Sequence, residues 1–203
     1  FNADINTNDC EVTVPVAVSA VDDCGLPVQI TNDMDNQLVS GAGNMVFTLP
    51  KGVHTIVFSA TDACSNVTEE TLTITVDDIK PPTARCSDIT VNLKTTGIAT
   101  VAAELIDNGS DDNCTDQANL IFMIQRNDSI GNPVGTPATE VVFDCNDIDE
   151  AQSVRLIVED DSGNSTFCNT TVTIMDNDSI CPPSSRFATV AGLISTSAGE
   201  PIS

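Results

Sequence analysis

The chain has 203 residues, a formal net charge of −23 and a hydrophobic fraction of 40% that contains neither Trp nor Tyr. Thirty acidic against seven basic residues exclude nucleic acid as an expected partner, because neutralising phosphates requires Lys and Arg. No apolar run approaches the ~18 residues of a membrane-spanning helix, so no membrane insertion is expected either. The predominance of Val, Ile, Thr and Ala favours the thin cores of β-sandwiches over helix bundles.

The first repeated pattern begins with a segment of alternating residues, EVTVPVAVSAVDDC (11–24), which ends in an acidic turn. HTIVFSATDACSN (54–66) is a second strand followed by an acidic turn. TEETLTITVDD (68–78) alternates hydroxyl and apolar side chains with period two, as a strand with one solvated face does. A proline pair, Pro81-Pro82, then closes the unit.

The same succession returns later in the chain. Its members are ATVAAELIDNGSDDNC (99–114), SVRLIVEDDSGNS (153–165), FCNTTVTIMDND (167–178) and the pair Pro182-Pro183, which follows Pro81-Pro82 by 101 residues. That period is about the ~100 residues of an immunoglobulin-like sandwich. No stretch has convincing helical periodicity. The sequence therefore predicts an all-β chain of tandem immunoglobulin-like β-sandwiches, in residues 1–80 and 81–183.

The last twenty residues, SSRFATVAGLISTSAGEPIS (184–203), start a new pattern of strand and turn. They cannot bury a sheet face alone, so we expect them to be the first strands of a third β-sandwich module. The first repeat has no counterpart of the strand entrance at Cys86, and its first strand region is expected to be truncated. We therefore expect the chain to be a part of a longer protein.

The eight cysteines occur singly rather than in CxxC pairs, and there is one histidine. Zinc sites usually have CxxC or HxxxH clusters. An even number of cysteines at domain-scale spacing instead indicates disulfides formed in an oxidising, extracellular compartment. The cysteines are Cys10, Cys24, Cys64, Cys86, Cys114, Cys145, Cys168 and Cys181.

At this point the residues resemble a known family. PPTARCSDITVNLKTTGIATVAAELIDNGSDDNC, VVFDC and VRLIVEDDSGNSTFCNTTVTIMDND are similar to a hyalin-type (HYR-like) repeat, common in large surface proteins of Bacteroidota-type bacteria. INTNDCEVTVPVAVSAVDDCG through FSATDACSNVTEETLTITVDD resembles another subtype, and VAGLISTSAGEPI resembles the opening of carboxypeptidase-regulatory-like sandwich modules. The resemblance implies spacers or adhesive stalks at the cell surface, often exported by type IX secretion.

Alternate loops of a sandwich lie at the same end, so the turn at Cys24 should meet the turn that holds Cys64. This predicts a Cys24–Cys64 disulfide. In the second repeat Ser162 stands near the place of Cys64, so Cys114 is predicted to pair with Cys145 instead.

Cys86 enters the first strand of the second repeat and Cys168 the last, and these strands are neighbours, which predicts Cys86–Cys168. Cys10 and Cys181 stay unassigned. They either bond to each other across the repeats or to other parts of a longer chain, and a Cys10–Cys24 bond requires the intervening segment to bend back.

Carboxylates concentrate where the two repeats are predicted to meet. Two interpretations stay open: calcium, which takes carboxylate, carbonyl and Asn oxygens and would stiffen the hinge, or a solvated acidic joint of turn-forming residues. The predicted calcium ligands are Asp77, Asp78, Asp107, Asp111, Asp112 and Asp160.

No catalytic constellation is found. His54, the sole histidine, sits in a predicted strand, and there is no GxSxG, P-loop or Rossmann fingerprint. A glycosidase would normally offer Trp or Tyr to stack on sugars. An enzyme is therefore not expected. Two DSI triplets resemble a short bacterial O-glycosylation signal and implicate Ser129 and Ser179.

The sequence thus predicts non-catalytic structural repeats of a secreted or cell-surface adhesin, stalk or filament, whose partners are neighbouring domains of the same chain. Direct binding of a surface glycan or protein ligand is the alternative, through residues 31–45 or 125–139, the segments that differ most between the repeats. A third interpretation is a subunit of a homo-oligomeric surface appendage, assembled through sheet edges or the terminal strand.

Overall fold

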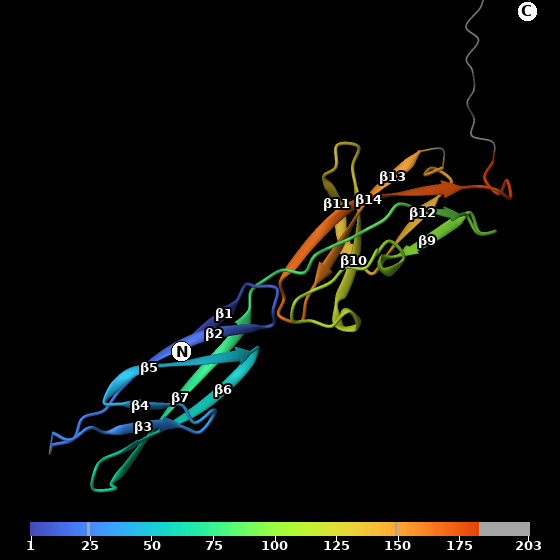
Figure 1. The fold of residues 1–203 in the computed structure, drawn as a ribbon. Helices are drawn as coiled ribbons and strands as arrows, with labels where there is room; N and C mark the ends of the chain where they lie inside the picture. Colours follow the sequence, from blue (N-terminus) through green and yellow to red (C-terminus); the bar gives the residue numbers. More distant parts are fainter. Residues whose placement is uncertain (24, 149, 183–203) are drawn as a thin grey trace, which may run out of the picture.

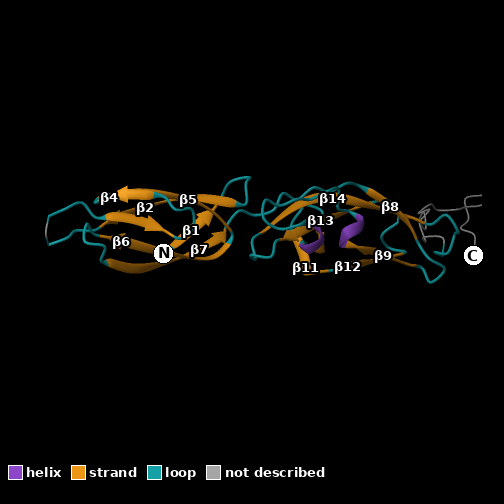
Figure 2. Cartoon of the chain, turned by 60° about the horizontal axis from the view of Figure 1, so that its bottom comes forward, coloured by secondary structure: helices purple, strands orange, loops and turns teal. Residues whose placement is uncertain are grey.

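The computed structural model describes residues 1–182 except Cys24 and Asp149, and the predicted third module lies outside these residues. Two β-sandwiches follow each other end to end (Figure 1), and apart from two 3-10 turns the described regular structure is all strand (Figure 2). The first repeat holds β1 (Asn2–Ile5), β2 (Glu11–Ser19), β3 (Gln29–Asn32), β4 (Leu38–Ser40), β5 (Ala42–Pro50), β6 (Gly52–Thr61) and β7 (Val67–Asp78). The second holds β8 (Ile89–Asn92), β9 (Ile98–Ala102), the turns η1 (Ala103–Leu105) and η2 (Gln117–Asn119), β10 (Ile121–Asn127), β11 (Pro133–Ala138), β12 (Glu140–Asp144), β13 (Ala151–Glu159) and β14 (Ser165–Met175).

The two repeats share one topology. In the first, a sheet of order β1-β7-β6-β3-β4 faces the pair β2-β5. In the second, a sheet of order β8-β14-β13-β10-β11 faces the pair β9-β12. In each repeat the short first strand runs parallel to the last strand, and every other pairing is antiparallel. The predicted fold class, tandem immunoglobulin-like β-sandwiches with disulfides, is confirmed.

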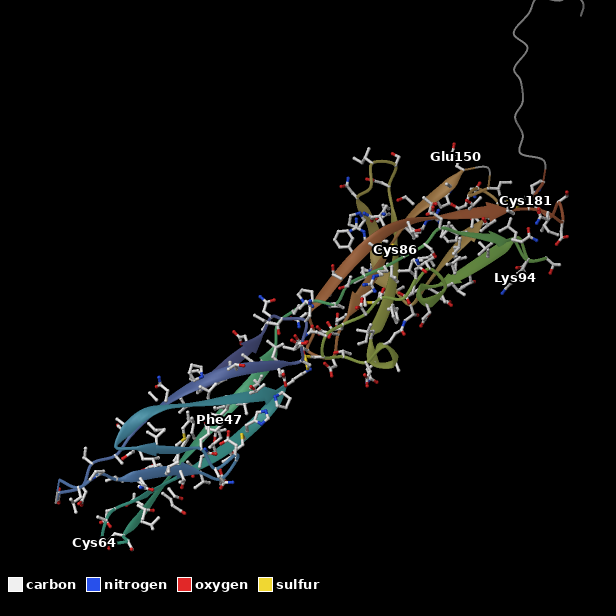
Figure 3. The ribbon with its side chains drawn as sticks, viewed as in Figure 1. Phe47, Cys64, Cys86, Lys94, Glu150 and Cys181 are labelled. Carbon is white, nitrogen blue, oxygen red and sulfur yellow. A yellow bond between two sulfur atoms is a disulfide. The ribbon has the colours of Figure 1, made fainter. Side chains whose placement is uncertain are left out.

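Each repeat has its own hydrophobic core, produced by period-two alternation along the strands. Along β5, Met45, Phe47 and Leu49 are buried while the residues between them are exposed. The Phe47 ring meets Phe58 of β6 edge to face, with centroids 6.1 Å apart (Figure 3 labels Phe47). In the second core, Phe143 of β12 is fully buried.

The same alternation places carboxylates at the ends of two inward-facing columns. On β7, Ile74 and Val76 are buried and Asp78 follows on the same face. After β13, Asp160 continues the face of Val158. Because successive side chains of a strand point to opposite faces, both aspartates turn into the protein at the joint between the repeats.

The disulfides agree only in part with the sequence-based expectations. Cys86 bonds to Cys168, as expected, and ties the entrance of the second repeat to β14. The remaining bonds are Cys10–Cys114, which joins the two repeats, and Cys145–Cys181, within the second. A bond across the repeats therefore exists, but it does not connect Cys10 to Cys181.

The predicted Cys114–Cys145 pair is wrong, because these cysteines lie at opposite ends of the sandwich. β12 runs antiparallel to β9, with Asp144 opposite Ile98, so Cys145 lies at the start of β9. Cys114 follows the segment after the end of β9, at the joint. The predicted Cys24–Cys64 pair stays a prediction, since Cys24 lies outside the described residues; Cys64 is exposed and has no disulfide partner among those described.

The carboxylate of Asp88 fastens the entrance of the second repeat to β14. Its Oδ1 accepts hydrogen bonds from the Thr170 hydroxyl at 2.8 Å, and from the Thr171 hydroxyl at 2.8 Å and amide at 2.9 Å. The two hydroxyls, Thr170 first, hold the pKa of Asp88 below its ordinary value. The ionised carboxylate is therefore the form that the folded state favours.

We expect the stabilisation from Asp88 to be lost in acid. A carboxyl whose pKa is lower in the folded state contributes its full stability above the unfolded-state pKa, ~3.9, and loses it as pH falls through the folded value. NMR titration of the Asp88 carboxyl should give a midpoint below the ordinary value. The advantage of the native chain over Asp88→Asn should shrink on acidification; a midpoint at or above the ordinary value would contradict this.

Candidate metal centre at the joint between the repeats

Three carboxylates from three different segments meet at the joint. Asp78 ends β7 of the first repeat, whereas Asp112, in the segment after β9, and Asp160, directly after β13, belong to the second. One carboxylate oxygen from each lies within 4.8 Å of the others. The cluster therefore forms only when the two repeats are in contact.

Two of these carboxylates are buried, Asp112 is partly buried, and the cluster is incompletely hydrogen-bonded. Asp78 is 3% exposed and Asp160 is 1% exposed. Asp78 Oδ2, Asp112 Oδ1 and the side-chain oxygen of Asn113 are buried with no hydrogen-bond partner. Buried polar atoms in proteins nearly always have a partner, so three orphaned oxygens make this cluster a candidate site for a cation.

The hydrogen bonds that do exist hold the carboxylates in place. Asp112 Oδ2 accepts from the amides of Cys114 and Thr115, both at 2.8 Å. Asp160 Oδ1 accepts from the amides of Ser162 and Asn164, at 2.9 and 2.8 Å. Each of these carboxylates is thus oriented by a tight turn, and Asp112 Oδ1 has no hydrogen-bond partner.

No lysine or arginine forms an ion pair with the three carboxylates in the described part of the chain. Lys51, the cation that crosses the joint, pairs with Asp161 and donates to the Ser162 hydroxyl at 2.6 Å. The hydrogen bond from Lys51, followed by one from Thr115, holds the pKa of Asp161 below its ordinary value. Lys51 therefore compensates the neighbouring exposed carboxylate and leaves the buried cluster without a counter-charge.

A calcium ion fits this donor set. The oriented groups are all oxygens, carboxylate and amide, with no nitrogen or sulfur ligand of the kind that zinc prefers. Calcium takes six to eight oxygens in flexible geometry and tolerates bidentate carboxylates. A divalent cation would also relieve the repulsion among two buried carboxylates and a partly buried one, since buried charges are costly unless they are paired.

The inter-repeat disulfide lies beside the cluster. Cys114 follows Asn113 directly in the sequence. The side-chain Nδ2 of Asn113 lies 3.2 Å from Cys114 Sγ and 3.4 Å from Asp78 Oδ1. Cys114 also packs against the core of the first repeat. Across the same joint the Asn164 side chain donates to the carbonyl oxygen of Asp78 at 2.9 Å. Covalent and polar contacts thus converge where the carboxylates meet.

The structure brings three of the six predicted calcium ligands together and gives the other three different surroundings. Asp77 is exposed, because it alternates with Asp78 on β7. Asp107 accepts hydrogen bonds from the amides of Gly109 and Ser110 and so closes a turn. Asp111 pairs with Arg85 at 2.5 Å.

The sequence analysis missed two asparagines at the cluster. Asn113 has an unpaired side-chain oxygen there, and the Asn164 side chain donates hydrogen bonds to the Asp78 carbonyl oxygen and to Asp160. DDNC (111–114) and DSGN (161–164) are ordinary turn sequences. The inward register of β7 and β13 selects Asp78 over Asp77 and Asp160 over Asp161. No comparable signal in the sequence distinguishes Asn113 and Asn164 from asparagines that only form turns.

The remaining residues named in the sequence analysis are not part of the acidic cluster. Ser129 and Ser179 are both exposed. His54 lies on β6, with Nε2 2.7 Å from the Pro50 carbonyl oxygen. The two segments expected as ligand-binding loops are largely hairpins: β4 lies within 31–45 and β11 within 125–139.

The comparison with solved structures finds similar chains, all at low identity. Human mucin-like protocadherin EC1-2 is 16% identical, with 87% of this chain and 95% of that chain covered and a TM-score of 0.41. The N-terminal four Ig domains of Dscam1 isoform 6.9 are 7% identical (86% and 43% covered, TM-score 0.43), so this chain spans less than half of that structure. DIP-gamma IG1+IG2 is 9% identical (85% and 93% covered, TM-score 0.41). The identities are too low for inference about ligands.

No protein-family model matches the chain, and no curated protein matches it. Within the described residues, no helix has the length and apolar character needed to cross a membrane.

Proposed function

We propose that this chain is a non-catalytic structural segment of a secreted or cell-surface protein, in which two sandwiches form one stiff unit of a stalk or filament. The observation that carries the proposal is the joint: a disulfide and a buried acidic cluster meet between the repeats. A joint held by a disulfide and by a cation in the acidic cluster suits a stiff spacer. Tandem domains that are connected by a small interface alone are expected to move relative to each other.

The proposed cation is calcium, bound by Asp78, Asp112 and Asp160 with the side-chain oxygen of Asn113. Extracellular calcium modules bind with dissociation constants of about 10⁻⁴ to 10⁻³ M, so the joint would be filled outside a cell. The hyalin-type resemblance of residues 1–183 supports a surface location, and type IX export from a Bacteroidota-type cell belongs to the same proposal. The proposed domain limits are 1–80 and 81–183, with a third module from 184.

Calcium is expected to stabilise the chain. At a free concentration one hundred times the dissociation constant, a ligand that binds only the folded state adds about 2.7 kcal/mol. For a repeat of this size that corresponds to a rise in melting temperature of roughly ten degrees or more. Thermal unfolding of the full chain in calcium and in chelator measures the effect directly. Equal melting temperatures in the two conditions would end the calcium proposal.

Matched variants locate the ion. Asp160→Asn keeps the turn geometry and removes one ligand charge, so it should abolish most of the calcium-dependent shift. Asp128→Asn is the control, because Asp128 closes the same kind of turn, with amides of Ile130 and Asn132 at 3.0 and 2.8 Å, away from the joint. A calcium shift that is unchanged in Asp160→Asn would place the ion elsewhere.

A further inference from the structure

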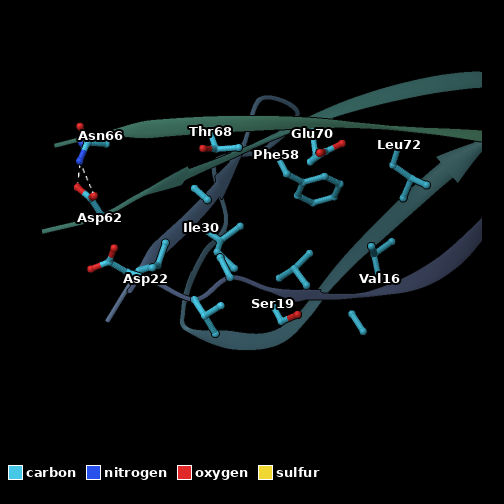
Figure 4. A pocket seen from close by; sticks show the side chains of 16 residues that line it. Val16, Ser19, Asp22, Ile30, Phe58, Asp62, Asn66, Thr68, Glu70 and Leu72 are labelled. Carbon is cyan, nitrogen blue, oxygen red and sulfur yellow. Dashed lines mark hydrogen bonds between the residues drawn. The ribbon is translucent and has the colours of Figure 1, made fainter. Parts of the chain in front are cut away.

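The turn that holds Asp160 occurs a second time, between β6 and β7 of the first repeat. There Asp62 Oδ1 accepts hydrogen bonds from the amides of Cys64 and Asn66, both at 2.8 Å, and Oδ2 accepts one from the Asn66 side chain at 2.7 Å. Figure 4 shows the bonds between Asp62 and Asn66. Asp160 makes the same three bonds in its own turn, at 2.9, 2.8 and 2.9 Å. The turn geometry is therefore a local property of the shared D-x-x-x-N sequence and does not by itself make a cation site.

Contact with the first repeat is what turns the Asp160 turn into a part of the cluster. Asp160 is 1% exposed, and its carboxylate lies beside that of Asp78 from the first repeat. The Asn164 side chain of the same turn donates to the Asp78 carbonyl oxygen at 2.9 Å. The proposed ligands from the two repeats are therefore together only while the joint is closed.

Both ends of the Cys10–Cys114 disulfide are attached to backbone that carries the proposed ligands. In the second repeat, the Cys114 amide donates to Asp112 Oδ2 at 2.8 Å. In the first repeat, Cys10 lies in the short segment between β1 and β2, and Ile5 at the end of β1 lies opposite Asp78 in the register with β7. The disulfide thus connects the two sides of the cluster directly.

The other contacts across the joint are weaker restraints. The ion pair of Lys51 with Asp161 has side chains that are 30% and 51% exposed, and exposed ion pairs contribute little to stability. Without a cation, the carboxylate of Asp78 repels those of Asp112 and Asp160 across the joint. The disulfide is therefore the contact that decides whether the empty joint stays closed.

We propose that the redox state of the Cys10–Cys114 disulfide regulates calcium binding at the joint, and that bound calcium protects this disulfide from reduction. The inference rests on the proposed calcium site and adds its regulation. With the bond intact, the ligands of both repeats are held together before the ion arrives, so binding costs less conformational freedom. With the bond reduced, calcium must also close the joint, and its affinity falls. Coupling between two sites is reciprocal, so calcium must stabilise the oxidised form by the same factor.

A dithiol is the class of reductant that this switch requires. Cys10 and Cys114 are both only partly buried, so the bond can be attacked by a thiolate. The dithiol is oxidised to a disulfide, and its two electrons pass to the sulfurs of Cys10 and Cys114. These sulfurs take up two protons and become thiols. The ligand residues themselves undergo no chemical change.

Calorimetric titration of the full chain with calcium chloride tests the first half of the proposal. In Cys10→Ser/Cys114→Ser the calcium dissociation constant should rise by about 5- to 150-fold, the usual range of coupling between two sites. Cys10→Ser alone should have the same effect, because it removes the bond and leaves the turn of residues 112–115 unchanged. Cys145→Ser/Cys181→Ser removes a disulfide at the opposite end of the second sandwich and should bind calcium like the native chain.

The native chain tests the second half without any substitution. It is equilibrated in mixtures of reduced and oxidised dithiothreitol, in calcium or in chelator, and its thiols are alkylated and located by mass spectrometry. In saturating calcium, half-reduction of Cys10–Cys114 should require a ratio of reduced to oxidised dithiothreitol that is higher by the factor found in the titration. Cys145–Cys181 is the internal control, and its half-reduction should be the same with and without calcium.

The outcomes separate this inference from the calcium site on which it rests. A native chain that binds no calcium would overturn both. Calcium binding of equal affinity in the native chain and in both serine variants of the inter-repeat bond would overturn the regulation alone. Half-reduction of Cys10–Cys114 at the same dithiothreitol ratio in calcium and in chelator would also overturn it, and this result does not depend on how well any variant folds.

Discussion

Replacing Phe143 by alanine is expected to lower the free energy of unfolding of the second repeat by about 3–5 kcal/mol, the usual cost of deleting a buried aromatic ring. Phe143 is fully buried and packs in a core with Ile124 and Leu156. The Arg126 guanidinium lies 4.5 Å from its ring centroid, so the substitution removes a cation–π contact as well. Urea unfolding followed by NMR signals of each repeat measures the loss.

The matched control is Phe167→Ala. Phe167 is 52% exposed on β14 and stacks with Arg155, whose guanidinium carbon lies 4.6 Å from the ring centroid, so its removal should cost about 0.5–1 kcal/mol. The first repeat has its own core around Phe47 and should keep most of its native signals in Phe143→Ala when the second has unfolded. Simultaneous loss of both sets of signals would show that the proposed limits 1–80 and 81–183 do not separate cooperative units.

The fold could be predicted because its signals are local. Period-two alternation in segments such as TLTITV fixes which side chains are buried, and the 101-residue recurrence fixes the size of the unit. Neither signal depends on which strand lies beside which. The sequence also predicted that acidic residues lie where the repeats meet, because acidic turns stand at the ends of the predicted strands.

The cross-links and the cluster depend on long-range geometry that the pattern does not contain. Excluding a Cys114–Cys145 bond required knowing that β12 ends beside the start of β9, at the far end of the sandwich from Cys114. Selecting Asp78 over Asp77 required the register of β7 against the core. Asn113 contributes through an orphaned side-chain oxygen, and composition cannot distinguish such an asparagine from the many that merely form turns.

Removal of the inter-repeat disulfide is the second large effect that we expect. Cys10 and Cys114 close a loop of 104 residues, and a native disulfide typically contributes about 2–4 kcal/mol, more for long loops, chiefly by restricting the unfolded chain. Cys10→Ser/Cys114→Ser should therefore unfold at lower urea concentration than the native chain. Ser162→Ala, which removes one hydrogen bond to Lys51 across the same joint, is the comparison and should change the midpoint far less.

The orientation of one repeat relative to the other should depend on both the Cys10–Cys114 disulfide and the proposed calcium ion. In weakly aligned samples the residual dipolar couplings of the native chain should fit one alignment tensor for both sandwiches. The double serine variant in chelator lacks the bond and the cation, so Asp78, Asp112 and Asp160 repel one another and the two sandwiches should require different tensors. Adding calcium to that variant should bring the tensors together again, because the ion takes ligands from both repeats. A single tensor in chelator would mean that the remaining contacts, Lys51 with Asp161 and Asn164 with the Asp78 carbonyl, already fix the joint, and calcium would then have no part in its stiffness.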